Sequence, residues 1–390
     1  MTIFLYLLLA LILLTGAVYA LRIRLLIRYP EPARADEIHY VTTADGWHIR
    51  LTRHTAGTAN AEPVLLVHGF ASNHLNFELP AGSCLVDYLN ERGYDCWTID
   101  LRGCESSVPP EGLRKASATV DGYVMDDLPA VVAYIKKETG APRIHWIGHS
   151  MGGMLLYAYE LIHGTDDLAC GVTVASPLGF HDVPYASPRL ALAMLRMSRG
   201  FIAGAANLGT PILMKWRPQE VKSAGGGVVR LPVNWDNLHP DITLRDALHL
   251  VDIPPHGVAK PMDGWFATKV WRMNKETVDV GVALDQLKLP LLAIFGVDDP
   301  LIPLHRAKEF VDALPTKDKK LLIRGKDHGA RVDYNHVDLV FSPYSEEDVY
   351  APVADWLKKH PVNAPKRKKK TAPKKKAAKK SAATKSAPAK

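Results

Sequence analysis

The sequence predicts an α/β fold in which helices cover both faces of a mostly parallel sheet. Short apolar segments typical of buried strands alternate with segments of helical periodicity, and clusters of turn residues separate the two kinds of segment. One strand, at residues 144–147, runs through a tight glycine turn directly into an apolar segment of helical length. Such sheets carry their active sites at the carboxyl ends of the strands.

The elements before that turn follow the same alternation. Residues 38–43 and 47–54 alternate apolar and polar side chains around Asp45-Gly46, which predicts a β-hairpin. Further strands are expected at residues 64–67 and 93–99. Helices are expected around residues 84–92 and 120–138, where apolar side chains recur at helical spacing.

After the turn, strands are expected at residues 170–175, 289–295 and 321–323, and a closing helix at residues 345–358 with Ser345 as its N-cap. The alternation stops between residues 177 and 288, a stretch rich in Pro, Gly, Met and Trp. We interpret it as an inserted lid or cap that faces an apolar substrate. The alternative is that its apolar side chains, Trp265 and Trp271 among them, only pack the insertion onto the core.

Twenty uncharged and mainly apolar residues, 2–21, open the chain. As a helix they would be roughly 30 Å long, the thickness of a bilayer core. Arg22, Arg24 and Arg28 follow, so the positive-inside rule places the amino terminus outside and the catalytic domain in the cytoplasm. A cleaved signal peptide is the alternative, but no basic segment precedes the apolar run. We therefore predict a single-pass membrane protein.

The net charge of +7 comes from the carboxyl-terminal tail, because residues 366–390 contain twelve Lys and Arg and no acidic residue. The rest of the chain carries a net charge of −5 (7 − 12), which argues against a body that reads nucleic acid. The four cysteines show neither metal-ligand spacing nor a disulfide framework. We expect no metal and no cofactor.

The tail, residues 361–390, contains only Lys, Arg, Ala, Pro, Ser, Thr, Val and Asn. This composition cannot form a core and predicts disorder. Its charges would bind a polyanion. Anionic lipid comes first because the predicted anchor already holds the chain at a membrane. Nucleic acid is the second possibility, and a purely solubilising tail is the third.

These observations predict five parts. They are a transmembrane anchor at residues 1–28, a core in two pieces at residues 36–176 and 289–360, a lid at residues 177–288 and a disordered Lys-rich tail at residues 361–390.

The candidate nucleophile lies in Gly148-His149-Ser150-Met151-Gly152, a G-x-S-x-G sequence between a strand and a helix. Ser150 would occupy the apex of a strained turn, and the two glycines would be needed because a Cβ at either position would crowd it. The following helix would direct its positive end toward the serine. The alternative is a strand-to-helix turn with an incidental serine.

A serine hydroxyl needs a base, and the base needs an acid to orient it. In this architecture the chain order is Ser, then Asp or Glu, then His. Asp298 and Asp299 follow one strand, and His328 and His336 follow the last strand. The residues themselves do not decide which aspartate is the acid or which histidine is the base.

Two other histidines, His68 and His149, flank the turns at the predicted site and are expected to shape the pocket. An acyl-transfer site also needs donors for the developing oxyanion. We expect these to be the backbone N–H groups of Met151 and Phe70, with Gly69 allowing the loop of Phe70 to approach closely.

Several segments together resemble the α/β-hydrolase superfamily, and within it the acid-lipase branch of gastric and lysosomal lipases. They are Val-Leu-Leu-Val-His-Gly-Phe at residues 64–70, Gly-Tyr-Asp at 93–95, Asp-Leu-Arg-Gly at 100–103, the segment at 127–152, and Tyr-Asn-His-Val-Asp at 334–338. The resemblance covers residues 38–360, with the insertion matching poorly. It implies an α/β-hydrolase fold, carboxylic-ester hydrolysis and a triad of Ser150, Asp299 and His336, with His328 as the alternative base. Polyhydroxyalkanoate synthases are similar in outline but use cysteine where this chain has Ser150.

The leading hypothesis is a membrane-anchored serine ester hydrolase that acts on an apolar acyl ester through an acyl-enzyme. The first alternative is an acyltransferase or thioesterase with the same triad. The second is a non-catalytic tether between a membrane and nucleic acid, formed by the anchor and the basic tail.

Overall fold

The computed structural model describes residues 2–58, 60–104, 106–176, 233–275 and 277–363, without some side chains of the first helix and the insertion. Within these ranges an eight-stranded sheet has the order β1-β2-β4-β3-β5-β6-β9-β10. β2 pairs antiparallel with β1 and with β4, and the other neighbours are parallel. The strands are β1 (Glu37–Thr42), β2 (His48–His54), β3 (Glu62–Val67), β4 (Tyr94–Asp100), β5 (Ile144–His149), β6 (Leu168–Val174), β9 (Leu291–Gly296) and β10 (Lys319–Arg324). The mostly parallel α/β fold and the hairpin are confirmed.

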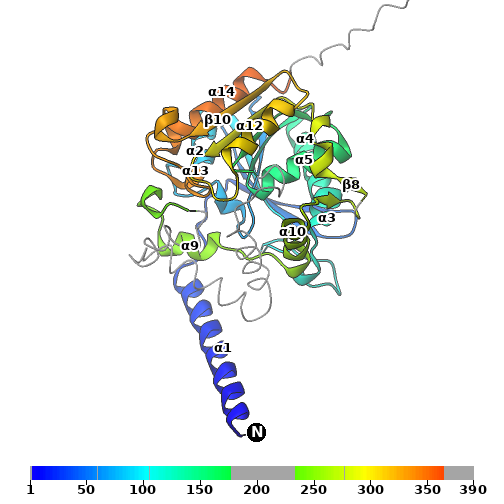
Figure 1. Cartoon of the computed structure of the whole chain (residues 1–390). Helices are drawn as coiled ribbons and strands as arrows, with labels where there is room; N and C mark the ends of the chain where they lie inside the picture. Colours follow the sequence, from blue (N-terminus) through cyan, green and yellow to red (C-terminus); the bar gives the residue numbers. More distant parts are fainter. Residues whose placement is uncertain (1, 59, 105, 177–232, 276, 364–390) are drawn as a thin grey trace, which may run out of the picture.

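Helices cover both faces of the sheet (Figure 1). One apolar core includes residues of α4 (Leu128–Thr139), α5 (Met151–His163) and α12 (Leu304–Ala313). The other includes residues of α2 (Leu85–Asn90), α13 (Asp338–Phe341) and α14 (Ala351–Lys359). Strand β3 supplies both, because Leu65 and Val67 join the first core while Val64 and Leu66 join the second. This is the two-residue side-chain period of a strand buried on both faces.

The predicted helix at residues 120–138 is interrupted in the structure. A short helix, α3 (Val120–Gly122), passes into a π-helical segment, Tyr123–Asp127, and α4 begins after it. Pro129 lies in the first turn of α4 and has no N–H to donate back along the helix, which accounts for a wider turn at this point. The closing helix likewise opens with a π-helical segment, Glu346–Tyr350.

Ser345 takes the N-cap position of the closing helix, as predicted, but not through its side chain. Its side chain makes no capping bond to the helix. The hydroxyl instead donates to the carbonyl of Asp338 and accepts from the backbone N–H of Ser342. Ser345 is fully buried, so its hydroxyl takes partners from the chain that packs against it rather than from the free end of a helix.

The apolar amino-terminal segment forms helix α1 (Thr2–Arg28), which extends away from the body (Figure 1). Several of its apolar side chains are exposed, including Leu13, Leu14 and Ile27. None of the helices formed by the described residues combines the length and the apolar character that a bilayer crossing requires.

The second part of the insertion is described, and its first part, residues 177–232, lies outside the described residues, as does the tail from residue 364. The described part contains α9 (Leu244–Leu250), α10 (His256–Thr268), the small pair β7 (Arg272–Met273) and β8 (Val278–Asp279), and α11 (Val280–Ala283). Trp265 and Trp271 are buried, with ring centroids 5.9 Å apart. For these two side chains the packing interpretation therefore applies. The domain limits stay a prediction.

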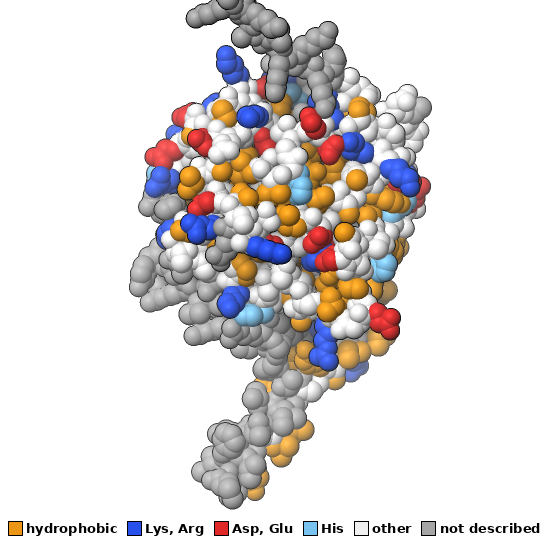
Figure 2. All heavy atoms as spheres, turned by 90° about the vertical axis from the view of Figure 1, so that its right-hand side faces the viewer, with side chains coloured by type: hydrophobic (Ala, Val, Ile, Leu, Met, Phe, Trp, Pro, Cys, Tyr) orange, Lys and Arg blue, Asp and Glu red, His pale blue; other side chains and the backbone are white. Residues whose placement is uncertain are grey.

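Acidic and basic side chains are interspersed over the face of the body shown in Figure 2. Hydrophobic side chains lie between them and continue onto the projecting helix below. The four cysteines are free and buried, so no described pair forms a disulfide.

Candidate active site

Ser150 lies at the turn between β5 and α5 with φ 51° and ψ −116°, a conformation that L-residues rarely adopt. Two glycines make the turn possible. A Cβ on Gly148 would lie 2.3 Å from the carbonyl carbon of Gly152, and a Cβ on Gly152 would lie 2.0 Å from the carbonyl oxygen of Val67. The strained turn is tied to the sheet because the backbone N–H of Ser150 donates to the carbonyl of Val174 at 2.8 Å.

Two side chains from loops at the same end of the sheet meet Ser150. The Nε2 atom of His336 is 2.8 Å from the Ser150 hydroxyl, and the Nδ1 atom of His336 is 2.8 Å from Oδ2 of Asp299. A carboxylate only accepts, so a neutral His336 satisfies both bonds by donating Nδ1–H to Asp299 and accepting the Ser150 hydroxyl at Nε2. This tautomer leaves Nε2 ready to take the serine proton.

The other candidates for base and acid lie elsewhere. His328 belongs to a short 3₁₀ helix, Lys326–His328, and its side chain is exposed. Asp298 is also exposed, whereas Asp299 and His336 are both buried. Asp299 is fixed further because its Oδ1 accepts from the backbone N–H of Leu301 at 2.8 Å. The structure therefore brings Asp299 and His336 to Ser150, and leaves Asp298 and His328 at the surface.

His149, buried beside the nucleophile, supports the loop of His336. Its Nε2 is 3.3 Å from the carbonyl oxygen of His336, and its Nδ1 is 3.1 Å from Oδ1 of Asn76. Burial, and to a smaller extent the neighbouring His336, lowers the pKa of His149 to about 3. His149 is thus neutral at ordinary pH and adds no charge to the site.

The loop expected to hold the oxyanion, residues 68–73, lies against Ser150 and is here called the oxyanion loop. A Cβ added to Gly69 would be 3.2 Å from Cβ of Ser150, so only a residue without a side chain allows this approach without displacement. His68 is buried and its Nδ1 lies 2.8 Å from the carbonyl of Gly69. Phe70 follows in this loop, and Met151 opens α5 on the other side of the serine. The role of their N–H groups as oxyanion donors stays a prediction.

A buried carboxylate that the sequence did not single out organises the histidine loop. Asp338 accepts from the backbone N–H of Asn335 at 3.1 Å and from Nδ2 of Asn237 at 2.8 Å. It also accepts from the backbone N–H of Asn234 at 3.1 Å, so it joins the insertion to the loop of His336. In the sequence Asp338 appears only as the last residue of the Tyr-Asn-His-Val-Asp segment, and its burial and hydrogen bonds in the fold reveal this function.

An ionic cluster lies behind the oxyanion loop. Nδ1 of His74 is 2.9 Å from Asp100, whose carboxylate also accepts from the backbone N–H of His74 at 2.8 Å. Arg50 lies 3.4 Å from Asp100, and both Arg50 and His74 contact Glu31. Burial alone would lower the pKa of His74, but the charges of Asp100 and Glu78 outweigh it and raise that pKa to about 10.

This cluster predicts a pH dependence of stability. The folded pKa of His74, about 10, lies above its unfolded value of about 6.5. Between these values the folded state keeps a proton that the unfolded chain releases, so the free energy of unfolding falls as pH rises through this window. Urea unfolding at pH 6.5 and pH 9.5 should differ by about 2–5 kcal/mol for this group. The profile of His74→Gln should be flatter, and equal slopes in both proteins would contradict the assignment.

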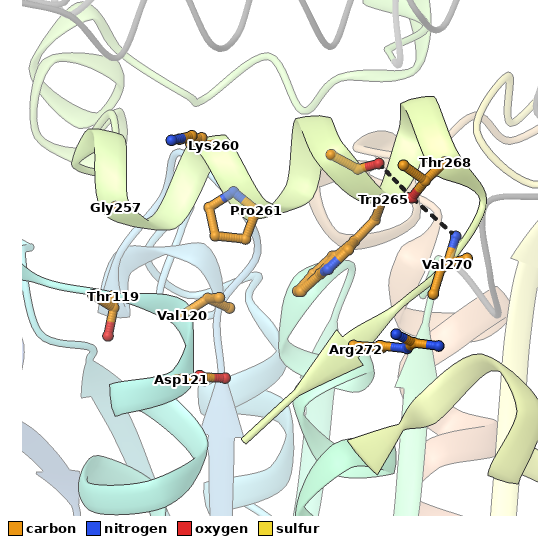
Figure 3. A pocket seen from close by; sticks show the side chains of 11 residues that line it. Thr119, Val120, Asp121, Gly257, Lys260, Pro261, Trp265, Thr268, Val270 and Arg272 are labelled. Carbon is orange, nitrogen blue, oxygen red and sulfur yellow. Dashed lines mark hydrogen bonds between the residues drawn. The ribbon is translucent and has the colours of Figure 1, made fainter. Parts of the chain in front are cut away.

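A cavity of about 700 Å³ lies between α10 and α3 (Figure 3). Val120, Pro261 and Trp265 form apolar walls, and Lys260 and Arg272 lie at its margin. Ser150, Asp299 and His336 are not among the described residues that line it. Among the described residues, no group of His, Cys, Asp and Glu is arranged to hold a metal ion.

This chain is similar to known proteins in both family and sequence. A family model described as alpha/beta hydrolase fold matches residues 62–330. Lipase 1 of Drosophila melanogaster is 33% identical over 123 residues, which are 30% of this chain and 28% of that protein. A poly(3-hydroxyalkanoate) polymerase subunit of Haloferax mediterranei is 24% identical over 313 residues, 76% of this chain and 58% of that one.

Among solved structures, a thermophilic esterase from Thermogutta terrifontis superposes with a TM-score of 0.55 at 22% identity, covering 83% of this chain and all of that one. This likeness concerns the fold alone. The chain spans less than two thirds of the length of the curated relatives it matches.

Proposed function

This chain belongs to the alpha/beta hydrolase fold family, and we propose that it hydrolyses carboxylic esters through an acyl-enzyme on Ser150. The observation that carries the proposal is the continuous hydrogen-bonded line from Asp299 through His336 to the Ser150 hydroxyl. The named activities of lipase and esterase relatives support the same reaction class.

In the proposed mechanism each step of ester cleavage has a named group to perform it. Oγ of Ser150 attacks the ester carbonyl while Nε2 of His336 takes its proton, and Asp299 stabilises the imidazolium. The N–H groups of Met151 and Phe70 would stabilise the oxyanion. The intermediate then collapses, and His336 protonates the departing alcohol. A water molecule, deprotonated by His336, cleaves the acyl-serine and releases the carboxylic acid.

We propose an ester with an apolar acyl group as the substrate class. Apolar side chains of α10, Val258 and Met262, join the core that also contains Met151 and Met154 of α5, and Lipase 1 of Drosophila melanogaster, 33% identical over 123 residues, is a lipase. A series of p-nitrophenyl esters of increasing acyl length, assayed on the full chain in detergent, tests this. Activity should increase from acetyl to medium-chain esters. A wild-type chain that hydrolyses none of them would contradict the proposal.

The acid can be tested with a matched pair of variants. Asp299→Asn should lower kcat about 10⁴-fold, because an amide no longer holds the histidine in the required tautomer. Asp298→Asn, at an exposed position in the same loop, should stay within about twofold of wild type. Steady-state ester hydrolysis measures both. Equal losses of kcat in the two variants, or a larger loss in Asp298→Asn, would show that Asp299 is not the acid.

Acyl transfer is a second candidate, because the similarity to a polymerase subunit extends over 76% of this chain. In that case an alcohol would replace water in the second step. Product analysis with a short ester and a large excess of added alcohol distinguishes the two reactions. Free acid as the main product supports hydrolysis, whereas a new ester as the main product supports transfer.

We infer that α1 attaches the protein to a membrane, with the body in the cytoplasm and the basic tail on anionic lipid. Exposed apolar side chains along α1 and the arginines that follow them support this. Carbonate extraction of membranes should leave the full chain in the pellet and release a Leu13→Asp/Leu14→Asp variant. Release of the wild type would contradict attachment. Sedimentation with phosphatidylserine vesicles, compared with duplex DNA, tests the tail.

A further inference from the structure

The segment that leaves α1 is bound to the insertion. Arg245 of α9 donates from Nε to the carbonyl of Pro30 at 2.6 Å and from Nη2 to the carbonyl of Glu31 at 3.2 Å. His249, one turn further along α9, has its Nε2 atom 2.7 Å from the carbonyl of Tyr29. Since a carbonyl oxygen only accepts, His249 carries its proton on Nε2 and donates it. Residues 29–31 are therefore held by three donors from a single helix.

The same helix and the residues directly after it hold the oxyanion loop. Nδ2 of Asn73 donates to the carbonyl of His249 at 2.6 Å, and the backbone N–H of Asp252 donates to the carbonyl of Ala71 at 3.3 Å. Ala71 has φ 59°, which an alanine adopts at a cost in free energy. The turn after Phe70 therefore depends on contacts from outside the loop to keep its conformation.

The other side of the loop is tied to the same linker. Glu31 lies 3.1 Å from Arg50 and 3.2 Å from His74. A hydrogen bond from His74, followed by the charges of His74 and Arg50, lowers the pKa of Glu31 to about 2. The linker thus reaches the loop twice, through α9 to Ala71 and Asn73, and through its own carboxylate to His74.

The segment that carries α9 also contacts the histidine loop. The backbone N–H of His239 donates to the carbonyl of Phe341 at 2.7 Å, and Asn237 donates to Asp338. One stretch of the insertion, residues 234–252, thus spans from the loop of His336 to the loop of Phe70. The α1 linker fixes the end of this stretch that touches the oxyanion loop.

We propose that Arg245 and His249 are positioning residues, which dock the linker after α1 onto α9 and thereby hold the oxyanion loop in its active conformation. The inference rests on the proposed ester hydrolysis. Without the docked linker, α9 loses three bonds, the strained turn at Ala71 relaxes, and the Phe70 N–H moves away from the oxyanion. Displacements of about 1 Å at such a donor lower turnover by up to about 10²-fold.

The test uses full-length protein in detergent. Arg245→Met keeps the length of the side chain without its donors, and His249→Phe keeps the ring without its N–H. Each should lower kcat for a p-nitrophenyl ester about tenfold, with KM within about twofold, because the oxyanion forms only after binding. The inhibition constant of a trifluoromethyl ketone, which forms a tetrahedral adduct on serine, should rise by the same factor. Arg245→Lys should recover most of the lost turnover.

Arg143→Met is the matched control. Arg143 also donates to two backbone carbonyls, those of Pro361 and Val362, but it precedes β5 at the end of the sheet opposite Ser150. It should change neither kcat nor the inhibition constant by more than about twofold. If one test variant fails to fold, judged by thermal unfolding, the other carries the comparison.

Two failures are distinguishable. If the wild type hydrolyses esters and Ser150→Ala does not, but Arg245→Met and His249→Phe keep their kcat within about twofold of wild type, the positioning role is wrong and the proposed function stands. A rise in KM in both variants with kcat unchanged would also overturn the positioning role, because it would indicate a substrate-binding function. If the wild type itself hydrolyses no ester, the proposed function fails first.

Discussion

Replacing Ser150 with alanine is expected to lower kcat for ester hydrolysis by at least about 10⁴-fold, while KM changes little. The reason is that the hydroxyl oxygen is the group that His336 activates at 2.8 Å, and alanine leaves only the oxyanion donors and substrate binding to assist water. Methyl and hydroxymethyl side chains fit the same turn, since the strain at φ 51° belongs to the backbone. The fold should therefore survive the change.

The measurement is steady-state hydrolysis of a p-nitrophenyl ester, together with labelling by a fluorophosphonate. The wild type should be labelled at Ser150 and the variant should not be labelled. Ser117→Ala is the control, because Ser117 is exposed and its hydroxyl donates to the nearby carbonyl of Arg114. An unchanged kcat in Ser150→Ala would contradict the proposed acyl-enzyme mechanism.

Replacing His336 with glutamine is expected to cost about as much as losing the serine, because serine and histidine act as one unit. His336→Gln leaves the Ser150 hydroxyl without a base and Asp299 without the imidazole it orients. The same change at His328 should alter kcat less than about twofold, since that side chain is exposed and away from the site. The two variants change the same atoms at positions eight residues apart in the chain.

Initial rates across pH 5–9 with each purified variant provide the comparison, and thermal unfolding checks that both remain folded. If His328→Gln were inactive and His336→Gln remained active, His328 and not His336 would be the base. Loss of activity in both would indicate a movement that brings His328 to Ser150. Each of these outcomes contradicts the arrangement of the two loops described above.

Local features of the sequence determined the fold to a large degree. The strands and the hairpin follow from short-range patterns of apolar side chains, and these patterns correspond to β1–β6, β9 and β10 within a residue or two at most ends. The turn at Ser150 was also predictable, because the G-x-S-x-G sequence between a strand and a helix is a local signal. Gly148 is required by a contact within the turn, with Gly152, whereas the contact that requires Gly152 is with Val67 of β3, which only the fold brings close. The local pattern was insufficient at Pro129, where a continuous helical periodicity hid a π-helical turn.

Only the tertiary structure decided which side chains meet. The sequence allowed two acids and two bases, since all four follow strands that end at the same edge of the sheet. Their burial and the 2.8 Å contacts of His336 separate them. The sequence also gave no indication that Asp338 joins the insertion to the histidine loop, or that Arg245 binds the linker after α1.

The physical reason is the range of the interactions. A strand or a tight turn is specified by residues within a few positions of one another, so a short segment of the sequence is enough to predict it. A contact such as that between Arg245 and Pro30, or between His336 and Ser150, joins residues about two hundred positions apart through bonds that hold only at distances near 3 Å. Such contacts depend on the packing of the whole sheet and its helices, which the periodicity of a single segment does not encode.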